Sequence, residues 1–348
     1  MIHMQPDAVI SHFPHKRMEA WKWTDLRMSV SEEHMGLTRA VTPRLTLPDG
    51  VSCSPGNRHH GSSGVMPTLA AGFAPVCWNI RVPTGLNVQG PLRIDNLSGG
   101  HACMFIRVDK GASLDIEEYH QGPDRRFSNM DLQVHLAEGS RLRRVVVQND
   151  PGNAVRVATA CIAAEKHSIL EQYMLSFGGA LSRLETRLYS EGEGIEATMN
   201  GAYLLDGRRH TDMTGHVEIA GSHCTVRQSV KGVVTDKSRG VFQGKFHVKQ
   251  AAQHTDARMR HDALMLSDTT EVRARPELEI YADDVACAHG NTIGALDENV
   301  LFYMRQRGIP QARSRSMLTE AFVAEAFDDL DDAASKQSLL TRVQEWLA

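Results

Sequence analysis

The sequence predicts a mainly β protein that ends in a helical tail. Short strand-like runs, separated by glycine-containing turns, fill the chain from about residue 76 to 285, and no long amphipathic helix interrupts them. After these strands, helix signals begin at Asp297. Such a series of strands is typical of a β-sandwich, a β-barrel or a β-solenoid. The repeated strand–turn units favour the solenoid, in which each coil stacks on its neighbour.

The clearest strand covers residues 130–136, "MDLQVHL", where apolar and polar residues alternate. This period of two puts its four apolar side chains on one face and its polar side chains on the other. Breaks such as "DKGAS", "AEGS" and "SEGEG" separate such runs. Further strand candidates are residues 113–118, 144–149, 167–175, 195–205 and 216–221.

The N-terminal part of the chain has a different character. Residues 17–27, "RMEAWKWTDLR", predict a short helix that runs into a turn. Residues 41–72 are rich in Pro, Gly and Ser, which is typical of a loop or linker. We therefore expect an N-terminal helical and loop region over residues 1–75, followed by the strands over residues 76–295.

Residues 296–348 are predicted to form a C-terminal helical region. Asp297 is a suitable N-cap for a helix over residues 297–307, with Gly308 and Pro310 beyond its end. A second helix is expected to start at Ser316. The last segment has leucines and a valine at helical spacing, namely Leu339, Leu340, Val343 and Leu347.

Composition excludes several classes of function. The net charge of the 348-residue chain is −4 and there is no basic block, which argues against nucleic-acid binding. No apolar run approaches the roughly 18 residues that a membrane helix needs. The first residues lack the apolar core of a signal peptide, so we expect a cytoplasmic protein. The six cysteines are widely spaced and form no CxxC, which indicates that most are buried small hydrophobes and that there is no disulfide framework.

Two stretches have residue types that bind ligands in other proteins. Gly232, Gly240 and Gly244 could cradle a phosphate, but glycines at this spacing more often serve tight turns between stacked strands. Residues 208–224 contain three histidines, an aspartate and a cysteine that could form a metal cluster. Their spacing defines no compact site, so polar residues on a β surface are the favoured interpretation. These residues are His210, Asp212, His216, His223 and Cys224.

Cys287 and His289 form a third candidate, in "ADDVACAHGNTIGALDENV". If residues 284–289 are extended, both side chains lie on one face of the strand. Thiolate and imidazole are ligands of soft or borderline metals and of iron–sulfur species. Two ligands do not complete a cluster, so another chain would have to supply the rest. The alternative is a buried cysteine beside a packing histidine, and the spacing alone favours that alternative.

The residues around this pair resemble the SufB/SufD family of iron–sulfur cluster assembly proteins. The resemblance is strong over about residues 205–327 and rests on the pattern P-x-L-E-I-x-A-D-D-V-x-C-x-H-G. "RMEAWKWTDL" is similar to an N-terminal element of SufD. Gly290 follows the histidine, as in SufD-like chains, whereas an acidic residue is typical of SufB-like chains. Asn291 departs from the "GATVG" run that is more usual in the family.

The resemblance implies a right-handed parallel β-helix flanked by N-terminal and C-terminal helical regions. It also implies a scaffold subunit, not an enzyme, that pairs with a SufB-like subunit and an ABC-type ATPase (SufC) and helps to acquire iron and build clusters. His289 would be a ligand or iron-handling group at the subunit interface, with Cys287 beside it. The iron or cluster would be transient and shared with the partner, and the chain would hold no permanent cofactor.

The same resemblance implies that the C-terminal helices dock the ATPase. Phe322 and Phe327 are the predicted partner-binding residues, and replacing both with Asp should abolish ATPase binding. Two alternatives stay open at this point. One is a β-helix carbohydrate-active enzyme, and the other is a metal-free homodimeric interaction module, since β-helix edges need pairing or covering. A homodimer is also possible for the chain in isolation.

Overall fold

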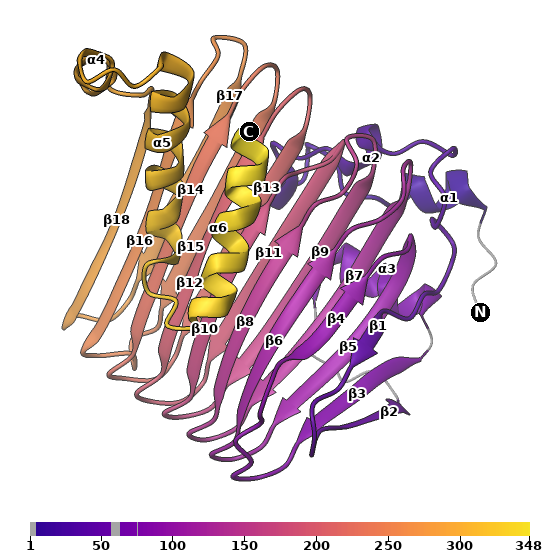
Figure 1. Cartoon of the computed structure of the whole chain (residues 1–348). Coiled ribbons are helices and arrows are strands. Elements are labelled where there is room, and N and C mark those ends of the chain that lie inside the picture. Colours follow the sequence, from indigo (N-terminus) through magenta and orange to yellow (C-terminus); the bar gives the residue numbers. More distant parts are fainter. Residues whose placement is uncertain (1–4, 57–62, 75) are drawn as a thin grey trace.

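The computed structural model describes residues 5–56, 63–74 and 76–348 and shows a parallel β-helix with helices packed on its outside (Figure 1). Successive strands alternate between two nine-stranded sheets, which we call sheet I and sheet II. Sheet I contains, in spatial order, β1 (Arg44–Thr46), β4 (Leu92–Asn96), β6 (Ser113–His120), β8 (Arg141–Gln148), β10 (Ile169–Ser176), β12 (Glu196–Leu205), β14 (Thr225–Val234), β16 (Thr255–Met265) and β18 (Val285–Gly294). Sheet II contains β2 (Ser52–Gly56), β3 (Cys77–Val82), β5 (Gly100–Val108), β7 (Phe127–Leu136), β9 (Val155–Ala164), β11 (Leu181–Ser190), β13 (His210–Ile219), β15 (Arg239–Val248) and β17 (Glu271–Ile280).

Apolar ladders between the two sheets form the core of the β-helix. Strands of neighbouring coils pair in register, so inward-facing side chains stack on one another. One ladder in sheet II ends at Leu278, which is only half-buried because no further coil covers it. Its members are Ile80, Ile106, Val134, Ile162, Leu188, Val217, Phe246 and Leu278.

The two ends of the β-helix differ. At the N-terminal end, the short strands β1 and β2 pair antiparallel with β4 and β3 and cover their edges. At the C-terminal end, β17 and β18 are each ten residues long and pair on one side only, within the described part of the chain. The C-terminal end therefore carries two long unpaired edges.

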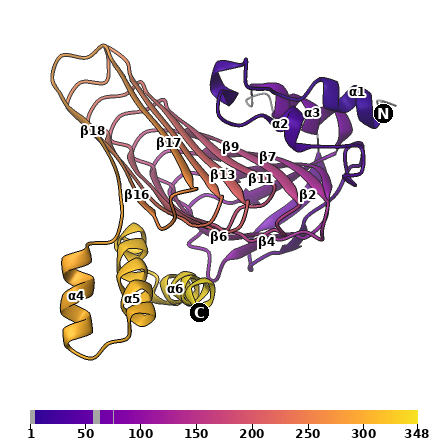
Figure 2. The same ribbon diagram turned by 90° about the horizontal axis from the view of Figure 1, so that it is seen from above.

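Helices cover the outer faces of both sheets (Figure 2). The N-terminal segment lies over sheet II, and the C-terminal helices lie over sheet I through a second apolar core. The helices are α1 (Pro6–Ser11), the short 3₁₀ helix η1 (Glu19–Trp21), α2 (Leu26–Ser29), α3 (Val65–Phe73), α4 (Glu298–Gln306), α5 (Gln311–Ala324), the 3₁₀ helix η2 (Glu325–Phe327) and α6 (Ala333–Leu347).

The predicted fold class is confirmed, and the differences lie at the flanks. All six strand candidates overlap strands of the structure, and four of them extend one or two residues beyond a strand end. Residues 41–72, expected as loop, contain β1, β2 and all of α3 except its last residue, because short antiparallel strands and a nine-residue helix tolerate Pro and Gly near their ends. The helix expected from Ser316 begins at Gln311, directly after Pro310, which has no N–H that needs an acceptor.

The prediction of buried cysteines without disulfides holds for some of the cysteines and not for others. Cys77 and Cys103 form a disulfide that links β3 to β5, because the parallel register brings their Cα atoms to 4.7 Å. The sequence spacing gave no sign of this pairing. Cys161 and Cys224 are buried, as expected, while Cys53 and Cys287 are half-buried.

Candidate functional site

Cys287 and His289 lie on β18, the last strand of sheet I and part of the last coil. In the register with β16, Cys287 pairs with Ala257 and His289 pairs with Met259. Cys287 packs against the core of the β-helix, and strand alternation puts His289 on the same side of β18. The structure therefore has the extended backbone on which the sequence-based hypothesis for this pair depends.

Both side chains are partly open because no coil covers β18. Cys287 is half-buried and His289 is exposed. Burial raises the pKa of the Cys287 thiol, so the thiol is protonated at neutral pH until a metal displaces the proton. Within the described ranges, no group of three or more His, Cys, Asp or Glu side chains is placed to hold a metal ion. A cluster bound at this pair therefore needs ligands beyond those that the described residues place there.

Apolar side chains surround the pair at the open end. Val272, Ala274 and Leu278 of β17 and Val285 of β18 pack against the core but remain half-exposed. Farther along these strands, the exposed fraction is 41% for Ile280 and 43% for Ile293. The open end thus presents a small apolar surface with one thiol and one imidazole on it.

A groove of about 750 Å³ runs along the outer face of sheet I next to β18. His289 and Gly290 border it on one side, and Asp329, after η2, borders it on the other. Its arginines are paired with aspartates, for example Arg227 with Asp256. The groove therefore has mixed charge and a polar floor. Its lining residues are Thr198, Asn200, Arg227, Gln228, Ser229, Arg258, Met259, Arg260, Ala288, His289, Gly290, Thr292 and Asp329.

The residues proposed as a metal cluster within 208–224 do not form one site. Asp212 is fully buried and accepts hydrogen bonds from Arg183, at 2.7 Å, and from Thr24, at 2.5 Å. The bond from Thr24 ties the N-terminal segment to sheet II. His223 stacks on His254 at a turn, with ring centroids 4.8 Å apart. The favoured interpretation of polar residues on the β-helix is therefore consistent with the structure.

The glycines proposed as a phosphate cradle or as turn residues lie within strands and make room for large side chains. A Cβ at Gly232 would lie 2.2 Å from Cζ of Tyr203, and a Cβ at Gly240 would lie 2.4 Å from Cε2 of the same ring. A Cβ at Gly244 would lie 2.3 Å from Sδ of Met259. Both sequence-based interpretations are wrong, because these residues face the packed core and no turn begins at them.

The two predicted partner-binding residues, Phe322 and Phe327, lie on α5 and η2 of the C-terminal helical region. Phe327 has no exposed area and packs in the core between the helices and sheet I. Phe322 is half-buried, and the ammonium of Lys231 lies 4.8 Å from its ring centroid. Phe327 is thus not available as a surface contact in this conformation. The exposed aromatic residues in this region are Phe302 and Tyr303 on α4.

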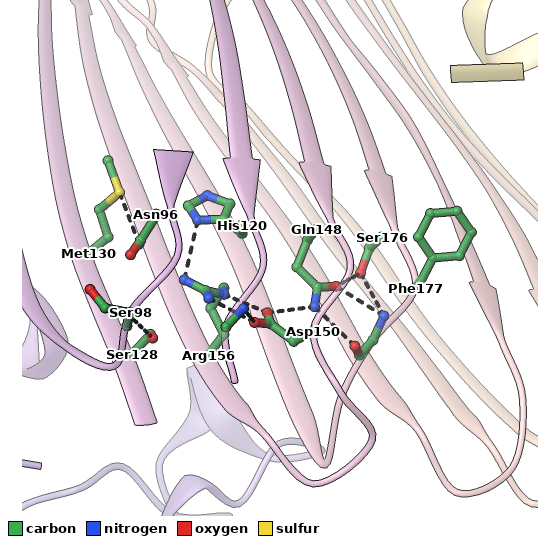
Figure 3. A network of polar contacts seen from close by, with 12 residues as sticks. Asn96, Ser98, His120, Ser128, Met130, Gln148, Asp150, Arg156, Ser176 and Phe177 are labelled. Atoms are coloured by element: carbon green, nitrogen blue, oxygen red, sulfur yellow. Dashed lines mark hydrogen bonds and ion pairs between the residues drawn. The ribbon is translucent and has the colours of Figure 1, made fainter. Parts of the chain in front are cut away.

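A buried polar network in the first half of the β-helix has no local sequence signal (Figure 3). Arg156 donates to both carboxylate oxygens of Asp150, at 2.6 and 2.8 Å, and lies 3.3 Å from His120. Gln148 donates to Asp150 and accepts from Ser176. Burial alone would raise the pKa of Asp150, but the charge of Arg156 and these hydrogen bonds lower it. Only the register of strands about one coil apart brings these residues together.

Fold and open end together define a class of protein: a parallel β-helix with terminal helices and one uncovered end. The family model "SUF system FeS cluster assembly, SufBD core domain" matches residues 93–322. The chain therefore belongs to the SufBD family of iron–sulfur cluster assembly proteins.

Relatives match this chain over most of its length. It is 26% identical to the iron-sulfur cluster assembly protein SufD of Escherichia coli, over 95% of this chain and 88% of that protein. It is 31% identical to an iron-sulfur cluster assembly SufBD family protein of Synechocystis, over 91% of this chain and 84% of that protein. A SufBD family protein of Mycobacterium tuberculosis is 25% identical over 90% of this chain. The sequence-based assignment to the SufB/SufD family, as a SufD-like member, is confirmed.

Proposed function

We propose that this chain is a SufD-like scaffold subunit that pairs with a SufB-like subunit and with a SufC-like ABC-type ATPase. In this proposal the chain helps to acquire iron and to build nascent clusters, and it has no catalytic centre of its own. The observation that supports the proposal most directly is the open C-terminal end, with its two unpaired ten-residue strands.

Unpaired strand edges are a hazard that proteins normally cover, because free N–H and C=O groups invite pairing with other chains. The N-terminal end has such a cover in β1 and β2. The C-terminal end instead presents two long edges and half-exposed apolar side chains. A second β-helix of similar cross-section could continue both sheets and both apolar ladders. A SufB-like subunit is the partner that we propose for this place.

The proposed pairing gives Cys287 and His289 their function. Thiolate and imidazole bind iron and iron–sulfur clusters, and Cys287 and His289 offer one of each at the open end. The partner would supply the remaining ligands, and the nascent cluster is cargo that leaves after assembly. His289 is the proposed ligand or iron-handling group, and Cys287 is its neighbour.

The C-terminal helices are the proposed docking site of the ATPase. Helix α4 projects away from the β-helix and contacts α5 (Figure 2). The side chains of Phe302 and Tyr303, adjacent on α4, are 60% and 58% exposed, and adjacent exposed aromatic residues suit a protein-binding surface. Movement of this helical region during ATP hydrolysis could be transmitted to sheet I, on which α5 and α6 pack.

The alternative functions have less support. A glycoside hydrolase needs two suitably spaced carboxylates, whereas Asp329 is the only acidic residue that lines the groove beside β18. A homodimer would use the same open end, so it differs from our proposal in the identity of the partner. Of the helices that the structure describes, none is long and apolar enough to span a membrane. Cytoplasmic localisation remains part of the proposal.

Ile293→Lys tests the proposed pairing. The charge would lie on the apolar surface of the open end, so the yield of complex co-purified with the SufB-like partner should fall at least tenfold. Leu97→Lys is the matched control, since Leu97 is 48% exposed and lies near the opposite end of the β-helix. Equal yields of complex for both variants would contradict pairing at the C-terminal end.

A further inference from the structure

A chain of hydrogen bonds connects β18 to the interior of the β-helix. Nδ1 of His261 lies 2.7 Å from Oδ1 of Asn291, and Nε2 of His261 lies 2.9 Å from the hydroxyl of Tyr203. His261 and Asn291 are register partners on β16 and β18. Tyr203 and His261 have no exposed area, whereas Asn291 is exposed. The chain therefore runs from the core to the last, uncovered strand.

The acceptor at one end fixes the protonation pattern of the imidazole. Oδ1 of Asn291 can only accept, so Nδ1 of His261 must carry a proton and donate. Burial lowers the pKa of His261, which favours the neutral ring. Nε2 is then unprotonated and accepts the hydroxyl proton of Tyr203. Oδ1 of Asn291, both ring nitrogens of His261 and the hydroxyl of Tyr203 thus each have a partner.

Packing holds the imidazole in place. The ring of Phe242 stacks on His261 with an interplanar angle of 2° and a centroid distance of 4.9 Å. The ring of Tyr203 occupies the space that Gly232 and Gly240 leave free. His261 therefore contacts Asn291 from a tightly packed, buried position.

We propose that Asn291 and His261 are positioning residues for the Cys287/His289 pair. Asn291 is two residues from His289, on the same side of β18. Strand β18 has a ladder of backbone hydrogen bonds on one side only, so its inner face depends on side-chain contacts with β16. The hydrogen bond between His261 and Asn291 holds the inner face of β18 in place at the open end. The benefit for cluster assembly rests on the proposed function, but the positioning itself can be measured without it.

The reactivity of the Cys287 thiol reports the positioning. Purified chain is treated with iodoacetamide, and the alkylation rate of Cys287 is measured by peptide mass spectrometry. Half-buried Cys53, at the opposite end, is the internal reference. In Asn291→Ala the bond is lost, and the rate at Cys287 should rise about fivefold, which corresponds to the roughly 1 kcal/mol of a typical hydrogen bond.

Asn291→Asp separates the hydrogen bond from a general loosening of the strand. The aspartate keeps an acceptor oxygen for Nδ1–H of His261, so its rate should stay within twofold of wild type. Thr292→Ala, one residue farther along β18, should also match wild type. The proposal is overturned if Asn291→Ala matches wild type, or if Asn291→Asp or Thr292→Ala is as fast as Asn291→Ala. The assay needs no partner, iron or sulfide, so failure of the proposed function would leave its result unaffected.

Discussion

Glycines in the strands determine which side chains can enter the β-helix core. Tyr203 pairs in register with Gly232 on β14, and its ring also lies against Gly240 on β15 of the opposite sheet. Gly290, on β18, has no atom within 4 Å of an added Cβ. Packing therefore requires glycine at position 232, whereas at position 290 a side chain would meet no steric obstacle.

This contrast predicts opposite effects of one methyl group. Gly232→Ala should lower the free energy of unfolding by about 1–3 kcal/mol, because a rigid tyrosine ring would have to move. Gly290→Ala should change it by less than about 0.5 kcal/mol. Urea unfolding of both variants measures the difference. A similar loss in both would show that the space around Tyr203 is not the cause.

The sequence could predict the Cys287/His289 pair because its signal is local. Both residues lie on one strand, within a long motif of the family. The function of Gly232 could not be predicted, because the ring that requires it lies one coil earlier in the chain. The same holds for Arg156 and His120, whose contact depends on the register of distant strands.

Helix α4 is the element whose surroundings differ most from those of its neighbours. Helices α5 and α6 bury Val323, Leu339 and Val343 against sheet I. Helix α4 buries Leu301 but leaves Phe302 and Tyr303 exposed. The sequence correctly indicated helices in this region, yet an apolar residue on a helix does not reveal whether the protein itself or a partner covers it.

Phe302→Asp tests the docking of the ATPase on α4. The variant should fold normally, because Phe302 is 60% exposed, but co-purification of the SufC-like ATPase should fall at least tenfold. Met28→Asp, at a position that is 81% exposed near the N-terminus, is the control. Phe327→Asp would unfold the helical region, since it places a charge in a dry core. Retention of the ATPase by Phe302→Asp would exclude this surface of α4.

At the scale of the whole molecule, buried histidines make stability depend on pH. His101 has no exposed area; its Nε2 lies 2.9 Å from the carbonyl oxygen of Leu37. Its Nδ1 lies 3.1 Å from Nδ2 of Asn129. Burial lowers the pKa of His101 from 6.5 to about 4, and burial has the same effect on His210. Both rings are thus neutral in the folded chain at pH values where the unfolded chain protonates them.

The sign of the pH effect follows from proton uptake. Between pH 6.5 and about 4, the unfolded chain binds a proton on His101 that the folded chain does not bind. Stability should therefore fall as the pH falls through this range, by up to about 1.4 kcal/mol per pH unit for each such histidine. His101→Gln should make the slope shallower in urea unfolding at several pH values. Parallel slopes for wild type and variant would contradict a neutral buried His101.

The asymmetry of the two ends relates the fold to the proposed function. One end of the β-helix is covered by the chain's own strands, and the other presents long edges, apolar side chains and the Cys287/His289 pair. Sequence patterns predicted the strands and the helical tail. They could not predict the covered end, because β1 and β2 lie in a segment whose composition resembles a loop.

The central claim is that this chain contributes His289 to a cluster site that it shares with its partner. The measurement is the visible absorbance of the complex with SufB-like and SufC-like partners, reconstituted anaerobically with iron and sulfide. In His289→Ala the complex should stay intact while the cluster band is lost or greatly weakened. Thr292→Ala, at an exposed neighbouring position, should retain the band. An unchanged band in an intact His289→Ala complex would contradict the claim and leave the chain as a scaffold without a ligand.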